Sequence, residues 1–160
     1  MKFSVKNQVI VNIRWMIRRD MPEIIGIEQA SFDYCWSEED FSKHLSRRNC
    51  VAYVAECREK IVGYLVYELN KNNLTILNLA VHLDWRWKSV GTQMINKLIV
   101  KLDGKRRRVI KINVRETNLS AQLFLRQKCF LAQSIKRGFY SDSGEDAYVM
   151  EYRLIDDQDW

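Results

Sequence analysis

Arg86-Trp87-Lys88-Ser89-Val90-Gly91-Thr92 stands between an apolar run, Leu74–Val81, and a helical run, Gln93–Leu102. A strand followed by a tight turn and a helix leaves several backbone N–H groups at the helix N-terminus without partners inside the helix. Together with the helix dipole, these groups form a site for an anion such as a pyrophosphate. Arg86 and Lys88 add positive charge, and Gly91 has no Cβ to keep a phosphate away. The stretch therefore predicts a phosphate-binding loop between a strand and a helix.

The length and composition of the chain are typical of one globular domain. Its 160 residues can bury a substantial core, and 47% of them are hydrophobic. We expect a single domain over residues 1–160, with a core at about 12–154 between short N- and C-terminal extensions. No apolar stretch reaches the roughly 20 residues of a membrane span, and the basic N-terminus has no apolar signal core behind it. A cytoplasmic protein with no membrane partner is therefore expected.

The net charge of +6 suits a polyanionic ligand. The densest basic run, Lys105–Arg108, follows Asp103-Gly104 in a predicted helix-to-strand turn. We interpret it as a solvated loop rather than a nucleic-acid surface, since nothing else in the chain matches a nucleic-acid-binding module.

Cysteine and histidine usage predicts no metal site. The four cysteines show no Cys-x-x-Cys spacing, and the two histidines, His44 and His82, are isolated. Scattered cysteines in a cytosolic domain are most simply reduced thiols that are at least partly buried. They are Cys35, Cys50, Cys57 and Cys129.

Hydrophobic periodicity and turn residues divide the chain into seven strands and four helices. Asp20, with Glu23 three residues later, and Ser37, with Asp40 three residues later, are candidate capping boxes, and Asn118 is a third candidate cap. The predicted strands are Ile13–Arg18, Val51–Cys57, Ile61–Leu69, Leu74–Val81, Val109–Val114, Leu131–Arg137 and Ala147–Arg153. The predicted helices run from Asp20 to about Ala30, from Ser37 to about Leu45, over Thr92–Leu102, and from Asn118 to about Lys128. The order β-α-α-β-β-β-α-β-α-β-β indicates a mixed α/β fold with a βαβ crossover at the phosphate loop.

Several further pieces of sequence accompany the phosphate loop. They are Ile27–Phe32 with Trp36-Ser37, Leu79–Val81, Val114–Asn118 with Ala121, and Phe139-Tyr140 followed by Glu145–Met150. In this order and spacing, residues 12–154 resemble the GNAT superfamily of acyl-CoA-dependent N-acyltransferases. Within it, the chain is most similar to the RimI-type N-terminal acetyltransferases, which acetylate the N-terminal alanine of a small-subunit ribosomal protein. The resemblance implies a single GNAT-like α/β domain with a mixed, mostly antiparallel twisted sheet of about seven strands and about four helices.

The resemblance also implies that acetyl-CoA is the cosubstrate and that no metal is needed. The family's loop pattern, Gln/Arg-x-x-Gly-x-Gly/Ala, falls on Arg86–Gly91, with Ser89 in place of the first glycine. Serine keeps the N–H and adds a hydroxyl donor, but its Cβ limits the backbone. The implied cofactor-binding residues are Leu79, Ala80 and Val81 for the pantetheine and acetyl group, Arg86, Trp87, Lys88, Ser89, Val90, Gly91 and Thr92 for the pyrophosphate, and Asn118 for the cofactor arm.

The residues that transfer protons in this family differ here. The usual general base, a glutamate, falls on Asn113, and the usual general acid, a tyrosine, falls on Leu125. Neither side chain can exchange a proton at neutral pH. A backbone α-amine, with a pKa of about 7.7–8.0, is partly neutral at pH 7, whereas a lysine amine near 10.4 is about three orders of magnitude less available. The two differences therefore favour an α-amine substrate or a severely slowed enzyme.

Tyr140, in the final loop, is the candidate catalytic residue, with substrate positioning as the alternative role. Glu116, His82 or a chain of water molecules are the other candidates for proton transfer. The resemblance places peptide recognition in the connection between the first two helices and in the last loop, on Phe32, Tyr34, Trp36 and Tyr140. Core packing is an equal alternative for Phe32 and Trp36. Asp33, Glu68 or Glu145 could receive a positively charged N-terminus.

These features favour acetyl transfer from acetyl-CoA to a protein N-terminal α-amine, by direct attack of the amine on the thioester. A ribosomal protein that begins with alanine is the expected partner. Two alternatives stay open. One is acylation of a small amine or a lysine, and the other is an acetyl-CoA-binding module with weakened catalysis.

Overall fold

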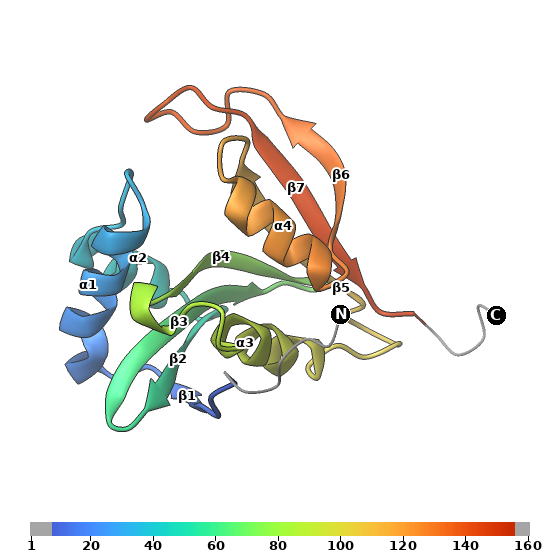
Figure 1. The fold of residues 1–160 in the computed structure, drawn as a ribbon. Coiled ribbons are helices and arrows are strands. Elements are labelled where there is room, and N and C mark those ends of the chain that lie inside the picture. Colours follow the sequence, from blue (N-terminus) through green and yellow to red (C-terminus); the bar gives the residue numbers. More distant parts are fainter. Residues whose placement is uncertain (1–7, 156–160) are drawn as a thin grey trace, which may run out of the picture. The chain divides into compact units, whose positions relative to one another are not determined.

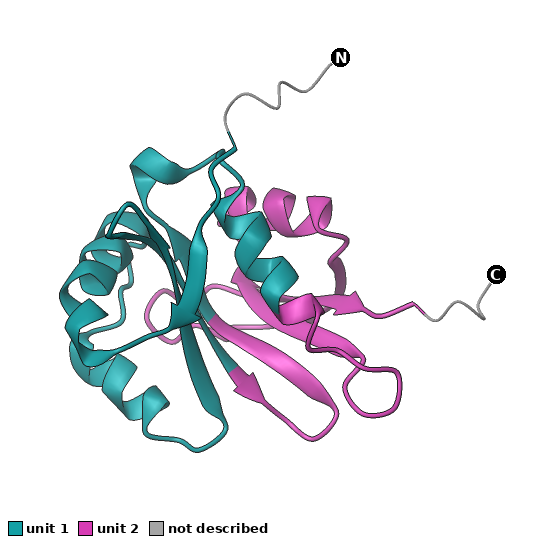
Figure 2. Cartoon of the chain, turned by 90° about the horizontal axis from the view of Figure 1, so that it is seen from below, with its two compact units in different colours: residues 1–67, 78–97 teal, residues 68–77, 98–160 magenta. Residues whose placement is uncertain are grey.

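The computed structural model describes residues 8–155. These residues form seven strands, four α-helices and two short 3-10 helices, and the strands and α-helices follow the predicted order (Figure 1). The chain divides into two compact units, residues 1–67 with 78–97 and residues 68–77 with 98–160 (Figure 2). β3, β4 and α3 each begin in one unit and end in the other. A single domain over the whole chain stays a prediction.

The first unit contains α1 and α2 and the predicted phosphate loop that follows β4. Its elements are β1 (Asn12–Trp15), η2 (Arg18–Asp20), α1 (Met21–Ser31), α2 (Glu38–Leu45), β2 (Cys50–Cys57), most of β3 (Lys60–Leu69), the end of β4 (Asn73–Val81), η3 (Leu83–Trp85) and most of α3 (Val90–Ile99). The second unit holds the start of β4, β5 (Val109–Arg115), α4 (Leu119–Gln127), β6 (Leu131–Lys136) and β7 (Ala147–Arg153).

The strands are hydrogen-bonded in the order β1-β2-β3-β4-β5-β7-β6. β1 pairs with β2, β5 with β7, and β6 with β7, all antiparallel. β4 runs parallel to β5, and α3 lies between them in the sequence. A parallel pair needs such a crossover, so the predicted βαβ unit and the mixed sheet are confirmed.

Most predicted element bounds are correct to within one or two residues, and two are wrong. The first strand ends at Trp15 rather than Arg18, because Asp20 N–H donates to the Ile17 carbonyl and turns the chain into η2. α3 begins two residues before Thr92 and ends at Ile99. Beyond Ile99 the chain continues as tighter turns, since the N–H groups of residues 101 and 102 donate three residues back.

Two of the three predicted caps are confirmed. The Ser37 hydroxyl accepts from Asp40 N–H at 3.1 Å, and the Asp40 carboxylate accepts from Ser37 N–H at 2.8 Å. The Asn118 side chain accepts from Ala121 N–H at 3.1 Å. Local hydrogen bonds therefore start α2 and α4 where the sequence predicts.

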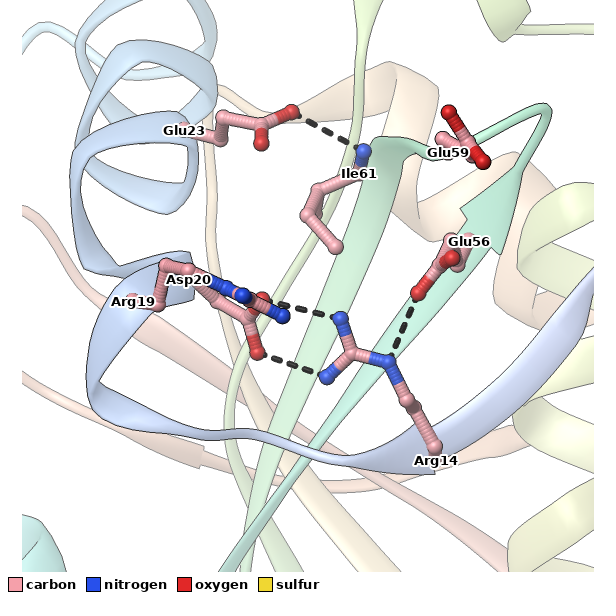
Figure 3. Close-up of a pocket in the computed structure, with 7 residues that line it drawn as sticks. All are labelled: Arg14, Arg19, Asp20, Glu23, Glu56, Glu59 and Ile61. Atoms are coloured by element: carbon pink, nitrogen blue, oxygen red, sulfur yellow. Dashed lines mark hydrogen bonds and ion pairs between the residues drawn. The ribbon is translucent and has the colours of Figure 1, made fainter.

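The predicted capping box at Asp20 is wrong, because its carboxylate has a stronger partner elsewhere. Asp20 lies at the cap position of α1, but it accepts two hydrogen bonds from Arg14 at 2.8 and 2.9 Å and one from Ile17 N–H (Figure 3). These bonds, Arg14 first, hold the pKa of Asp20 below its ordinary value. Arg14 also donates to Glu56, and Glu23 accepts from Ile61 N–H. Among the residues that line the pocket drawn in Figure 3, Arg14 thus ties β1 to β2 and to Asp20 at the start of α1, and Glu23 ties α1 to β3.

Neighbouring residues of β3 point to opposite faces of the strand and show which helices cover each face. Gly63 faces α3, because a Cβ added there would lie 2.9 Å from Met94 Cε. Tyr64 faces α1 and α2, because its hydroxyl donates to Glu28 and its ring meets Phe41 edge-on at 5.7 Å. The first unit therefore has α3 on one face of β3 and α1 with α2 on the other.

The second unit has its own core and an exposed edge. Leu125 of α4 and Phe130 are buried, and the Phe130 ring lies 5.7 Å from that of Tyr152 on β7. Every residue of β6 is exposed. In the basic run, Lys105 and Arg106 are exposed, and the prediction of a loop there is confirmed.

The four cysteines form no disulfide, but two of them are not buried as expected. Cys35 and Cys129 are exposed, and only Cys50 and Cys57 are partly covered. Cys35 lies in the connection after α1, and Cys129 adopts a positive φ of 67° in the turn after α4. Within residues 8–155, no helix combines the length and the apolar character that crossing a membrane requires.

Candidate active site

The predicted phosphate loop connects η3 to α3 with an unusual backbone. Trp87 and Ser89 have positive φ angles of 64° and 68°. The first helical bond of α3 runs from Gln93 N–H to the Ser89 carbonyl, so the three N–H groups before it have no partner inside the helix. Left-handed residues next to a helix N-terminus turn successive N–H groups toward one point, which is a favourable anion site. This φ also explains why a glycine suits position 89, since serine is strained there.

The side chain of Gln93 joins the loop to the segment before β1 by hydrogen bonds. Its side-chain nitrogen donates to the carbonyl of Ser89 at 3.1 Å and to that of Val9 at 2.6 Å, and its oxygen accepts from Val11 N–H at 3.1 Å. Val9 N–H in turn donates to the Lys88 carbonyl at 3.1 Å. The segment before β1 therefore braces the loop, a function that local sequence patterns did not indicate.

The side chains of the loop contact other parts of the first unit. Arg86 donates to the Val81 carbonyl at 3.0 Å and to the Ser31 hydroxyl at 3.2 Å, which joins the loop to the ends of β4 and α1. The ammonium of Lys88 lies 5.4 Å from the centre of the Trp85 ring. Both side chains thus belong to the loop that the sequence predicts to bind a phosphate.

The predicted acetyl-binding edge is the end of β4. The parallel ladder joins Asn73–Ile76 to Val109–Ile112 and stops there, whereas β4 continues to Val81. Leu79 and Val81 are half-buried, and Ala80 between them is buried. The three residues therefore lie in a part of β4 beyond its pairing with β5, where a ligand can bond to the strand.

The aromatic connection between α1 and α2 divides into packed and exposed side chains. The Trp36 ring stacks on His44 at 4.3 Å and meets Phe41 edge-on at 5.1 Å. Phe32 is half-buried, whereas Tyr34 is 47% exposed. Packing against α2 thus accounts for much of the Trp36 surface, whereas Tyr34 is largely exposed.

Glu28 is a further residue of this region, and sequence reasoning assigned it no role. It is only 1% exposed, and its carboxylate accepts hydrogen bonds from Trp36 N–H, Tyr64 and Asn78. The sequence could have indicated its burial, since Glu28 shares one helix face with the apolar residues Ile24 and Ile27. A carboxylate on an apolar face needs buried partners.

In the second unit, Tyr140 is fixed by contacts around both its ring and its hydroxyl. The hydroxyl donates to the Asn113 carbonyl at 3.3 Å, and the Arg115 guanidinium lies 3.9 Å from the ring centre. Burial raises the pKa of Tyr140 despite the opposing Arg115 charge. Tyr140 therefore keeps its proton at neutral pH and is suited to donate a hydrogen bond rather than to act as a base.

Arg115 holds the loop that carries Tyr140. It donates to Asp142 at 2.7 and 2.9 Å and to Glu145 at 3.1 Å. Glu145 also accepts from the Thr117 hydroxyl. Since the Glu145 carboxylate already has these partners, receiving a peptide N-terminus would require it to exchange one of them.

The other candidates for proton transfer also have structural partners. Glu116 accepts from Asp146 N–H at 3.2 Å, and His82 accepts from Asp84 N–H at 3.1 Å. Leu125 is buried in α4, and Asn113 lies half-buried on β5. In the described part of the chain, no group of three or more His, Cys, Asp or Glu side chains is arranged to hold a metal ion.

The first unit has a candidate anion-binding loop next to the end of β4. The second unit has a tyrosine, Tyr140, held by Arg115 and by the Asn113 carbonyl. Comparison with known proteins adds to these observations. The sequence model of the Acetyltransferase (GNAT) family matches residues 21–129. The chain is 26% identical to a putative [ribosomal protein bS18]-alanine N-acetyltransferase of Bacillus subtilis, over 86% of this chain and 92% of that protein.

A second relative and a solved structure extend the likeness. An N-alpha-acetyltransferase of Sulfolobus acidocaldarius is 27% identical, over 91% of this chain and 94% of that protein. The crystal structure of the ribosomal-protein-S18-alanine N-acetyltransferase from Escherichia coli matches with a TM-score of 0.79, at 21% identity, over 94% of this chain and 99% of that chain. This structural likeness concerns the fold alone.

Proposed function

Because the chain belongs to the GNAT acetyltransferase family, it is an acetyl-CoA-dependent N-acetyltransferase, and we propose that its acceptor is the α-amine of a protein N-terminus. The side chains at two positions carry this proposal. By the family resemblance, Asn113 and buried Leu125 fall at the positions of the family's base and acid, and neither can exchange a proton. A site without these groups suits an acceptor amine that is already partly neutral at pH 7, as an α-amine is.

The first unit supplies the groups for binding acetyl-CoA. The N–H groups around Ser89 and at the start of α3 would hold the pyrophosphate, with Arg86 and Lys88 adding positive charge. The end of β4, Leu79–Val81, would bond to the pantetheine and acetyl group. In the second unit, Asn118 is the residue that the family resemblance implies for the cofactor arm, and because its side-chain oxygen caps α4, its amide nitrogen is the atom proposed for that contact.

The chemistry needs only a neutral amine in the right place. The amine nitrogen forms a bond to the acetyl carbon and the carbon–sulfur bond of the thioester breaks. The nitrogen loses one proton and the departing sulfur gains one, so coenzyme A leaves as a thiol. At pH 7 roughly a tenth of an α-amine with a pKa of about 7.7–8.0 is neutral, whereas less than about a thousandth of a lysine amine near 10.4 is. Positioning the two reactants can contribute more than general acid–base assistance, which is typically worth roughly 10²–10⁴-fold.

Tyr140 is proposed to position the substrate rather than to take its proton. Its raised pKa and its bond to the Asn113 carbonyl both keep the phenol protonated. Tyr34 and Phe32 would supply apolar contact to the first residues of the peptide, and Asp33, exposed between them, can face its positive end. We further propose a ribosomal protein with an N-terminal alanine as the substrate, because the Bacillus relative is named for that activity, and the cytoplasm as the location.

Mass spectrometry of paired peptides tests the proposal. One peptide begins with a free alanine and contains one internal lysine, and its partner has the same sequence with a blocked N-terminus. We expect one acetyl group on the α-amine of the first peptide and none on the second. Acetylation of the lysine in both peptides would replace the proposal with a lysine acetyltransferase. Binding of acetyl-CoA with no transfer to either peptide would instead indicate a module that has lost catalysis.

A further inference from the structure

Glu28 is a buried carboxylate that receives hydrogen bonds from three separate segments. Trp36 N–H, in the connection between α1 and α2, donates to it at 2.8 Å. The Tyr64 hydroxyl of β3 also donates to it, and the Asn78 amide of β4 donates at 2.9 Å. These partners lie 8, 36 and 50 residues away along the chain. One side chain therefore joins the peptide-facing connection to two central strands.

The three hydrogen bonds replace the water that the buried Glu28 carboxylate would otherwise bind. A buried carboxylate is stable only where hydrogen bonds replace its hydration. Losing one of these bonds leaves an unsatisfied carboxylate oxygen and destabilises the fold. All three donors are neutral groups, so the bonds depend on direction rather than on a loose ion pair. The neighbouring charge adds to burial in raising the pKa of Tyr64, which keeps the phenol a donor.

Glu28 holds the connection after α1 at both ends. Its backbone carbonyl accepts from Phe32 N–H at 3.1 Å and from the Cys35 thiol at 3.7 Å, and its carboxylate accepts from Trp36 N–H. Asp33 and Tyr34, both exposed, lie between these two anchors. The shape of the segment that presents Tyr34 therefore depends on one residue.

The third bond reaches the strand predicted to hold the acetyl group. Asn78 immediately precedes Leu79 on β4, and their side chains point to opposite faces of the strand. Through Asn78, the carboxylate fixes the α1 side of β4 at the point where Leu79–Val81 begins. The phosphate loop has separate support from Gln93, which does not involve Glu28.

We infer that Glu28 is a positioning residue that sets residues 32–36 against β4, so that a peptide amine held by this segment lies in line with the acetyl group. The inference rests on the proposed function, because it assumes that the acceptor is a peptide bound at this connection. It predicts that disturbing Glu28 affects use of the peptide much more than binding of acetyl-CoA, since Gln93 holds the pyrophosphate loop independently.

Steady-state kinetics of Glu28→Gln, with a lysine-free peptide that begins with alanine, tests the inference. Glutamine has the same shape but turns an NH₂ group toward donors, so at least one of the three bonds is lost. We expect KM for the peptide to rise and its kcat/KM to fall about 10–100-fold, as for other displaced positioning groups. The Kd of acetyl-CoA, measured by calorimetry, should stay within about twofold of wild type.

Two partner variants keep the test decisive if Glu28→Gln folds poorly. Tyr64→Phe and Asn78→Ala each remove one donor and keep the charge, so each should raise the peptide KM by a smaller factor. The effects of Glu28→Gln and Tyr64→Phe should not be additive in the double variant, because the two side chains are in direct contact.

Wild-type peptide kinetics in folded Glu28→Gln, or in both partner variants, would overturn the inference. An equal loss of acetyl-CoA affinity and peptide kcat/KM would also overturn it, since that pattern describes a general structural role. If the wild-type protein acetylates no peptide α-amine, the proposed function itself fails. The two failures are therefore distinguishable.

Discussion

Gly63, on β3 beneath the start of α3, offers a direct test of how the cofactor strand is packed. An added Cβ would lie 2.9 Å from Met94 Cε, 3.1 Å from the Ala80 carbonyl oxygen and 3.4 Å from a methyl of Val90. The end of the methionine side chain can rotate away. The Ala80 carbonyl belongs to the backbone of β4, in the middle of the predicted acetyl-binding edge, and it must move by a few tenths of an ångström.

The magnitude follows from these contacts. Overpacking of this kind costs about 1–3 kcal/mol. Removing the flexibility of a strand glycine returns about 0.5–1 kcal/mol. We therefore expect Gly63→Ala to destabilise the protein by about 1–2 kcal/mol, which lowers the Tm by roughly 3–6 °C for a chain of this size. The shift of β4 should also weaken acetyl-CoA about three- to tenfold, which corresponds to about 0.7–1.4 kcal/mol.

Thermal unfolding and calorimetric titration with acetyl-CoA measure both effects. Gly26→Ala is the matched control, because Gly26 lies on α1 with nothing within 4 Å of an added Cβ. Alanine is favoured over glycine in a helix by up to about 1 kcal/mol, so this variant should be more stable and bind acetyl-CoA as wild type does. A Gly63→Ala protein with wild-type Tm and affinity would refute the packing described for β3, β4 and α3.

Three other perturbations give distinct readouts. Ser89→Gly should raise stability by about 1 kcal/mol in thermal unfolding, because glycine relieves a left-handed strain of about 1–3 kcal/mol at a smaller entropic cost; a lower Tm would contradict this. Asn118→Ala should cost about 1 kcal/mol through loss of the α4 cap, whereas Asn118→Ser should restore most of it, and equal melting of both would contradict the cap. Hydrogen bonds from Arg115 and Thr117 lower the pKa values of Asp142 and Glu145 respectively, so their contribution to stability is present above the ordinary carboxyl pKa and is lost as the pH falls through the lowered values. Urea unfolding from pH 7 to pH 2 should therefore show a smaller loss of stability in Arg115→Gln than in wild type, and parallel curves would argue against it.

Features set by residues close in sequence were predictable. Ser37 and Asn118 cap their helices through bonds to residues three positions away, so the pattern and the contact lie in the same short window. The phosphate loop likewise depends on a strand, a turn and a helix in immediate succession. The positive φ of Ser89 matches the glycine that the family pattern has at that position.

Features set by distant partners were not predictable from those windows. Asp20 stands at the cap position of α1, but its carboxylate accepts hydrogen bonds from Arg14 of β1 instead of capping the helix. Glu28 meets Tyr64 and Asn78 only once β3 and β4 pack against α1. The hydroxyl of Tyr140 donates to the backbone carbonyl of Asn113, and a backbone acceptor cannot be recognised from the type of residue.

The pH dependence of kcat/KM for a peptide with a free N-terminal alanine tests the central claim most directly. If the acceptor amine supplies its own neutral form, kcat/KM should rise with pH and level off with an apparent pKa close to the ordinary α-amine value of about 7.7–8.0. Changing Tyr140 to Phe should lower the plateau without moving that pKa. A profile that levels off well below this value, or an apparent pKa that moves in the Tyr140→Phe variant, would show that a side chain of the enzyme takes the proton and would contradict the account.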